Sequence, residues 1–136
     1  MKFEFLQHTA DAKFRAYGAT MEEAFANAAE AMFTVMLDCA KVEPNVAKKI
    51  SVTGADRKAM LYNFLEELLF LLDTHGFFLH KVDKVSIKDD KLTATIQGDT
   101  DPEKYETHGD VKAVTYNEME ILEEKGKVTV QVVVDI

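Results

Sequence analysis

The chain has 136 residues, of which 47% are hydrophobic and 29% are charged. This length matches one domain that can bury a core, and the composition excludes a largely disordered chain. The formal net charge of −8 argues against strong direct binding to nucleic acid, because such binding depends on clustered Lys and Arg. Only a few lysines hint at a basic patch: Lys48, Lys49, Lys81, Lys84 and Lys88.

Two features of the sequence indicate the compartment. Cys39 is the only cysteine, so the chain can form neither an intramolecular disulfide nor a cysteine zinc cluster. The N-terminal residues show no signal-peptide pattern, and Glu66 and Glu67 interrupt the longest apolar stretch. We therefore expect a cytoplasmic protein without a membrane span.

Two strands and a helix are predicted at the start of the chain. Apolar and polar residues alternate over residues 1–6 and again over 12–18, which is typical of strands. Apolar residues then recur at helical spacing, and Thr20 with Glu23 forms a capping box. This helix is expected to end near Asp38.

A strand over residues 47–54 and a second helix over 57–75 follow. Asp56 is suited to cap the start of the helix, and Gly76 is suited to end it. Apolar residues cover so much of the circumference of this helix that it should be largely buried.

The second half of the chain is predicted to form strands. Their expected ranges are 77–88, 91–98, 111–117, 119–126 and 127–136. Early helices followed by late strands favour an α+β fold, in which two main helices pack on a mainly antiparallel or mixed β-sheet within a single compact domain over residues 1–136. The last strand is the most apolar, so both of its faces should be covered.

Acidic residues at the two ends of the chain are candidate metal ligands. If the last strand lies beside the first hairpin, Asp11, Asp135 and the terminal carboxylate of Ile136 form a group of hard oxygen ligands. Asp38 is a weaker fourth candidate. Such a group suits Ca²⁺ or Mg²⁺ better than Zn²⁺. The alternative is that Asp11 is an ordinary turn residue and Asp135 a solvated tail residue.

His8 and Lys112 are further candidates. A histidine titrates near neutrality and can ligate a metal or transfer a proton, although a purely hydrogen-bonding role is the alternative. Lys112 can reach solvent along its aliphatic stem or point at a phosphate. The sequence contains no phosphate-binding loop, nucleophile elbow, HExxH motif or Cys-His pair. This favours a binding protein or accessory factor over an independent enzyme.

Five segments occur in order along the chain: HTAD at residue 8, AYGATMEEAFANAAEAMF, FLEELLFLLDTHG, VKAVTYNEMEI and the terminal VQVVVDI. Together they resemble the archease family over essentially the whole chain. The resemblance implies an activator of the RtcB-type tRNA-splicing ligase, which joins a 2′,3′-cyclic phosphate end to a 5′-hydroxyl through a guanylylated histidine of its own. It implies that the chain speeds this guanylylation, permits multiple turnover and does not itself join RNA.

The resemblance also implies site residues. The family's metal ligands fall on Asp11, Asp135 and Ile136, with Asp38 a weaker match by position, and the lysine of the KAVTY motif is Lys112. The implied cofactor is a divalent cation, Ca²⁺ or Mg²⁺, with Mn²⁺ a further candidate in the presence of the ligase.

The chain departs from the family pattern directly after HTAD. Many relatives have a small or branched apolar residue and Gly there, whereas this chain has Ala12 and Lys13. Lys13 brings a positive charge next to the expected metal site. Two other functions stay open: a chaperone-like modulator of a tRNA-modifying enzyme such as a tRNA methyltransferase, and a small metal-dependent phosphoesterase.

Overall fold

The computed structural model describes residues 1–7 and 10–136. The strands are β1 (Phe3–Leu6), β2 (Asp11–Gly18), β3 (Val46–Thr53), β4 (Phe78–Lys88), β5 (Lys91–Asp99), β6 (Ala113–Glu124) and β7 (Lys127–Asp135). The helices are α1 (Met21–Thr34) and α2 (Arg57–His75), with short 3₁₀ helices η1 (Cys39–Lys41) and η2 (Pro102–Lys104). One sheet has the order β1-β2-β7-β6 and the other β3-β5-β4, and every strand pair is antiparallel.

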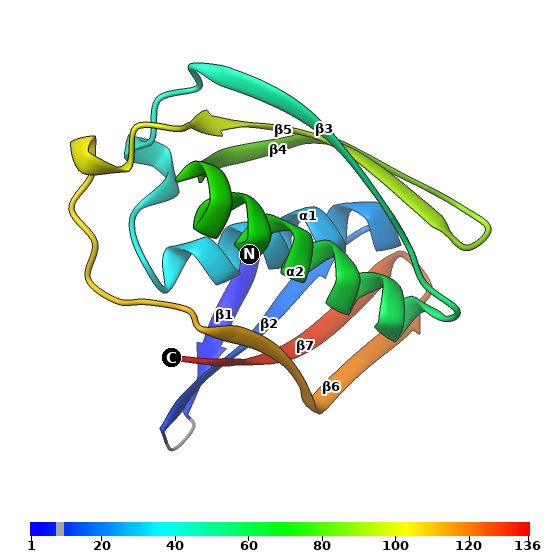
Figure 1. Ribbon diagram of the computed structural model, residues 1–136. Coiled ribbons are helices and arrows are strands. Elements are labelled where there is room, and N and C mark those ends of the chain that lie inside the picture. Colours follow the sequence, from blue (N-terminus) through cyan, green and yellow to red (C-terminus); the bar gives the residue numbers. More distant parts are fainter. Residues whose placement is uncertain (8–9) are drawn as a thin grey trace.

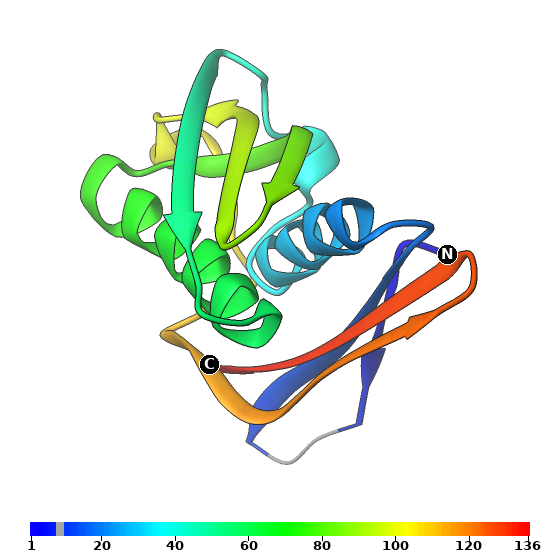
Figure 2. The ribbon, with the colours of Figure 1, turned by 90° about the vertical axis from the view of Figure 1, so that its right-hand side faces the viewer.

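The two helices lie between the two sheets (Figure 1 and Figure 2). Helix α1 packs on β2 and β7 of one sheet and on β4 of the other, while α2 packs on β6 and on β3 and β5. The buried residues of α2 are Met60, Leu61, Phe64, Leu65, Leu68 and Leu69. The predicted α+β class and the buried second helix are confirmed. The strands form two sheets where one was expected, because each helix buries apolar residues on two sides.

The helix ends follow local sequence signals. Thr20 Oγ1 accepts a hydrogen bond from Glu23 N at 3.1 Å, and Asp56 Oδ1 accepts one from Ala59 N at 2.8 Å. Gly76 ends α2 with a φ of 65°, in the left-handed region that glycine adopts without strain. The caps at Thr20 and Asp56 and the stop at Gly76 are confirmed.

Helix α1 ends at Thr34, about one turn before the predicted end near Asp38. The N–H of Val35 bonds to the carbonyl of Met32 at 3.3 Å, which is the tighter pattern of a helix that is ending. Asp38 instead caps η1, with its Oδ1 accepting from Ala40 N at 3.0 Å.

Strand β7 is central in the four-stranded sheet and is covered on both faces, as predicted. On its inner face, which packs against the helices, the buried residues are Val128, Val130, Val132 and Val134. On its outer face Val133 and Gln131 are also buried, at 1% and 5% exposure.

An irregularity in β6 covers that outer face. The predicted strands over 111–117 and 119–126 are one strand, which carries a bulge between Thr115 and Glu120. Glu118, within the bulge, has a φ of 52°, and its carbonyl accepts a hydrogen bond from Gln131 Nε2 at 2.8 Å. Strand β6 therefore continues through the bulge, and the bulge contacts the outer face of β7 through Gln131.

The loop from β5 to β6 crosses from one sheet to the other and is anchored at its start. Asp99 is 5% exposed, and its Oδ2 accepts hydrogen bonds from Tyr105 Oη at 2.6 Å and from Lys104 Nζ at 3.2 Å. Hydrogen bonds to Asp99 and Glu43 raise the pKa of Lys104 to about 12. This network fixes the loop that leads to Lys112. No helix in the described part of the chain is long and apolar enough to cross a bilayer.

Replacing Asp56 with alanine is expected to lower the free energy of unfolding by about 1 kcal/mol, because the N–H of Ala59 loses its acceptor. Urea unfolding of the parent chain and the variant measures this difference. Asp56→Asn should retain most of the stability, since Asn caps helices about as well as Asp. A loss from Asn as large as that from Ala would contradict the capping role.

Candidate metal and partner site

The register of the four-stranded sheet brings the two ends of the chain together. Asp11, the first residue of β2, lies directly opposite Asp135, the last residue of β7. Ala113, the first residue of β6, lies on the other side of Asp135. Residues directly opposite in an antiparallel pair project to the same face, with Cβ atoms about 4.5–5.5 Å apart. The strand order that the acidic site requires is therefore present.

Lys112 and Ile136 extend this corner of the sheet. The N–H of Lys112 donates to the carbonyl of Asp135 at 2.7 Å, so Lys112 lies at the point where the long loop enters β6. Ile136 follows Asp135 and is 47% exposed. Figure 1 shows the C-terminus beside the start of β2. We call Asp11, Lys112, Asp135 and Ile136 the acidic corner.

The electrostatics of the acidic corner favour a cation. Carboxylates that lie directly opposite each other across two strands destabilise the pairing. Asp135 forms no ion pair with any residue that the structure describes. Both side chains end in hard oxygens, and Asp135 is exposed, so a divalent cation can reach them. The oxygen donors of Asp11 and Asp135 therefore fit a hard cation such as Ca²⁺ or Mg²⁺ in their chemistry.

Lys13 lies on the same face as Asp11, two residues along β2. Its Nζ pairs with Glu118 Oε1 at 3.2 Å, and its side chain is only 16% exposed. Lys13, the residue that departs from the family pattern, is thus held by Glu118 of the β6 bulge. Glu118 is the residue near the site that sequence reasoning missed. Its signal in the sequence is the polar Asn117-Glu118 pair, which interrupts the strand alternation and favours a strand boundary there.

Asp38 is not part of this corner. Among residues 1–7 and 10–136, no three His, Cys, Asp or Glu side chains are grouped so as to hold a metal, so Asp38 does not join Asp11 and Asp135. Instead it lines a separate hollow together with Lys41, Lys104 and His108. His8, the remaining predicted contact residue, lies outside the described residues.

Cys39 follows Asp38 in the sequence, and its thiol is buried and unreactive. It is 3% exposed, and burial raises the pKa of its thiol to about 12. A thiol in this state is a poor nucleophile, because the thiolate is the reactive form.

We therefore expect Cys39 of the native chain to react at least about a hundredfold more slowly with a thiol reagent such as DTNB at pH 8 than Cys39 of the chain in urea. Release of the coloured thiolate measures both rates. Equal rates would show that the thiol is accessible in the folded chain.

Comparison with known proteins supports the same fold and shows the family. A model of the Archease protein family (MTH1598/TM1083) matches residues 3–136. The protein archease of Methanothermobacter thermautotrophicus is 46% identical over 98% of both chains, and that of Methanosarcina mazei is 40% identical over 99% of this chain and 96% of its own.

Two solved structures are also similar. The solution structure of Methanobacterium thermoautotrophicum protein 1598 has a TM-score of 0.83, is 44% identical and covers 99% of both chains. The crystal structure of an archease from Thermotoga maritima, described as a possible chaperone, has a TM-score of 0.66 at 14% identity, covers 96% of this chain and 94% of its own, and supports the fold alone. The chain belongs to the archease family, as the sequence motifs predicted.

Proposed function

We propose that this chain is a cytoplasmic activator of an RtcB-type tRNA-splicing ligase, which promotes guanylylation of the ligase histidine and multiple turnover. The family membership supports this proposal. The observation that carries it is the opposition of Asp11 and Asp135 at the end of the two central strands of the sheet. A pair of carboxylates at the protein surface can act on a partner if the partner's pocket closes over it.

Asp11, Asp135 and the carboxylate of Ile136 would hold the divalent cation, which is Ca²⁺ or Mg²⁺, or Mn²⁺ in the presence of the ligase. Oxygen ligands of this kind suit all three ions. When bound, the cation supplies positive charge that stabilises negative charge on phosphate oxygens.

The residues of the chain contribute position rather than covalent chemistry. Pairing of β2 with β7 sets Asp11 against Asp135 before any partner binds, so little ordering is needed on docking. The backbone bond to Asp135 holds Lys112 at the same corner, where its exposed side chain is suited to contact a phosphate. The buried thiol of Cys39 offers no nucleophile. These features support an activator and not a self-sufficient enzyme.

The direct test is the amount of guanylylated ligase formed from radiolabelled GTP and a divalent cation. The parent chain should stimulate this reaction, and Asp11→Asn and Asp135→Asn should each reduce the stimulation about tenfold or more, because each removes a negatively charged ligand. Asp73→Asn removes the same charge from an exposed site in α2 and should stimulate normally. Full stimulation by the Asp135 variant would refute the proposal.

A second candidate is a chaperone-like modulator of a tRNA-modifying enzyme such as a tRNA methyltransferase. The description of the Thermotoga maritima archease as a possible chaperone favours it, as does the net charge of −8, which suits a basic partner.

This function predicts that the chain suppresses light scattering by a heated methyltransferase at equimolar ratio. Suppression should be unchanged by EDTA and by Asp135→Asn, because it depends on the surface as a whole. Loss of suppression with EDTA would assign the effect to the metal site instead.

A further inference from the structure

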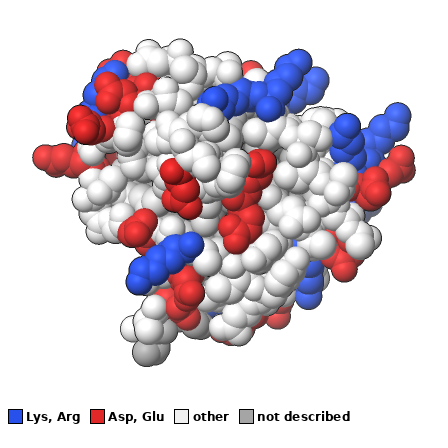
Figure 3. Space-filling view, viewed as in Figure 1, with Lys and Arg blue, Asp and Glu red and all other residues white. Residues whose placement is uncertain are grey.

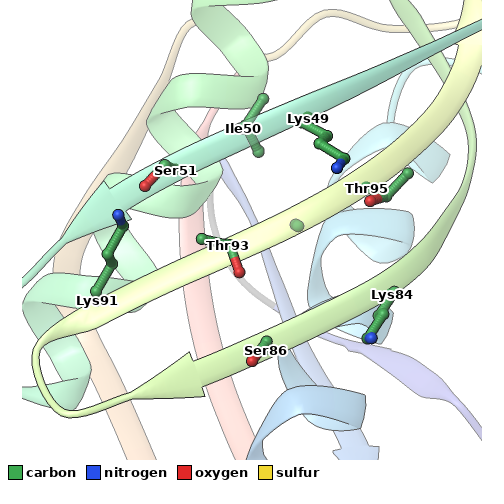
Figure 4. Close-up of a pocket in the computed structure, with 9 residues that line it drawn as sticks. Lys49, Ile50, Ser51, Lys84, Ser86, Lys91, Thr93 and Thr95 are labelled. Carbon is green, nitrogen blue, oxygen red and sulfur yellow. The ribbon is translucent and has the colours of Figure 1, made fainter.

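The outer face of the three-stranded sheet has a charge opposite to that of the chain. Along β5, Leu92, Ala94 and Ile96 are buried against the helices, whereas Thr93 and Thr95 point to the other side. This outer face contains an open hollow of about 570 Å³ (Figure 4). No element of the described chain covers it (Figure 2).

The register arranges side chains on this face in rows across the three strands. Lys49 of β3 and Lys84 of β4 both pair with Thr95 of β5. Ser51 and Ser86 likewise both pair with Thr93. At the end of the sheet Lys91 pairs with both Thr53 and Lys88, and Lys81 pairs with Gln97 at the other end. We call Lys49, Ser51, Lys81, Lys84, Ser86, Lys88, Lys91, Thr93 and Thr95 the basic face.

Most of these lysines have no partner within the described structure. Only Lys81 pairs with a carboxylate, that of Asp83 at 3.8 Å, and the other four lysines of the basic face form no ion pair with a described residue. Asp83 lies between Lys81 and Lys84 in β4, and Asp89 and Asp90 lie in the turn at one end of the sheet. Lys49 and Lys84 are thus free to meet an external anion.

The basic face stands out against the rest of the molecule. The exposed side of an antiparallel sheet is polar whatever its function, but in a chain of net charge −8 it should carry more acidic than basic residues. Figure 3 shows Lys and Arg at the upper right, over the three-stranded sheet, Asp and Glu mixed with them at the upper left, and mainly Asp and Glu over the middle of the view. The five lysines of the basic face outnumber Asp83, the aspartate that lies between Lys81 and Lys84.

We propose that the basic face binds the phosphate backbone of RNA. Lysine and hydroxyl side chains are the groups that contact phosphate and sugar in nucleic-acid complexes. An acidic protein partner would also meet the charge, but protein interfaces are centred on aromatic and apolar residues, and no side chain of the basic face is of that kind. The chemistry therefore favours a nucleic acid.

The same composition predicts how the RNA is bound. The basic face contains no aromatic residue that could stack on a base and no arginine that could contact the edge of a base. Binding should therefore depend on the phosphate backbone and not on the base sequence. Adjacent strands lie about 4.8 Å apart, so Lys49 and Lys84 are separated by about 10 Å at the backbone. A few contacts of this kind give weak, salt-dependent binding. This agrees with the expectation that the chain binds nucleic acid without great strength.

The test is fluorescence anisotropy of a labelled single-stranded RNA of mixed sequence, titrated with the full chain at several salt concentrations. The parent should bind at low salt, and its affinity should fall steeply as salt rises. Lys49→Gln combined with Lys84→Gln should weaken binding about tenfold and lower the slope of log K against log salt by about 1.4, because two phosphate contacts are lost. Lys49→Arg combined with Lys84→Arg should bind like the parent.

A matched control removes the same charge elsewhere. Lys2→Gln combined with Lys125→Gln changes two exposed lysines outside the basic face and should bind RNA like the parent. Circular dichroism checks that each variant is folded. An equal loss in this control, or no binding by the parent at low salt, would overturn the proposal, as would tighter binding of a poly-glutamate peptide than of RNA. The isolated chain is used throughout, so the result does not depend on the activator role.

Discussion

The antiparallel pairing of β2 with β7 is the interaction on which the rest of the structure depends. It runs from Asp11 opposite Asp135 to Gly18 opposite Val128, and so joins the start of the chain to its last strand. A shift of one residue would move every inward valine of β7 to the outer face, which the burial of these valines opposes strongly. The hydrophobic core thereby fixes the register, and the register fixes the opposition of the two carboxylates.

The second consequence of this architecture is that the molecule has two outer sheet faces with different chemistry. Because both helices lie between the sheets, each sheet turns one side to solvent. The four-stranded sheet carries the acidic corner at one end, and the three-stranded sheet carries the basic face. A divalent cation and a polyanion can therefore meet separate surfaces of this small protein without competing for one site.

Features that depend on neighbouring residues could be predicted from the sequence. The caps at Thr20 and Asp56 and the stop at Gly76 are local, and each agrees with the structure. The division into two sheets and the bulge around Glu118 could not be predicted, because they depend on pairing between distant segments. The basic face is of the same kind: Lys49 and Lys84 are far apart in sequence and are brought together only through β5. The sequence predicts the Asp11–Asp135 pair only if the last strand lies beside the first hairpin, and the structure shows this strand order.

Binding of a divalent cation at the acidic corner is tested most directly by titrating the isotopically labelled chain with Ca²⁺ or Mg²⁺ and following its amide signals by NMR. We expect the signals of Asp11, Lys112, Asp135 and Ile136 to shift together and to saturate with one affinity, and we expect Asp135→Asn to abolish the shifts. Shifts that centre on another part of the surface, or that persist unchanged in Asp135→Asn, would contradict binding at this corner.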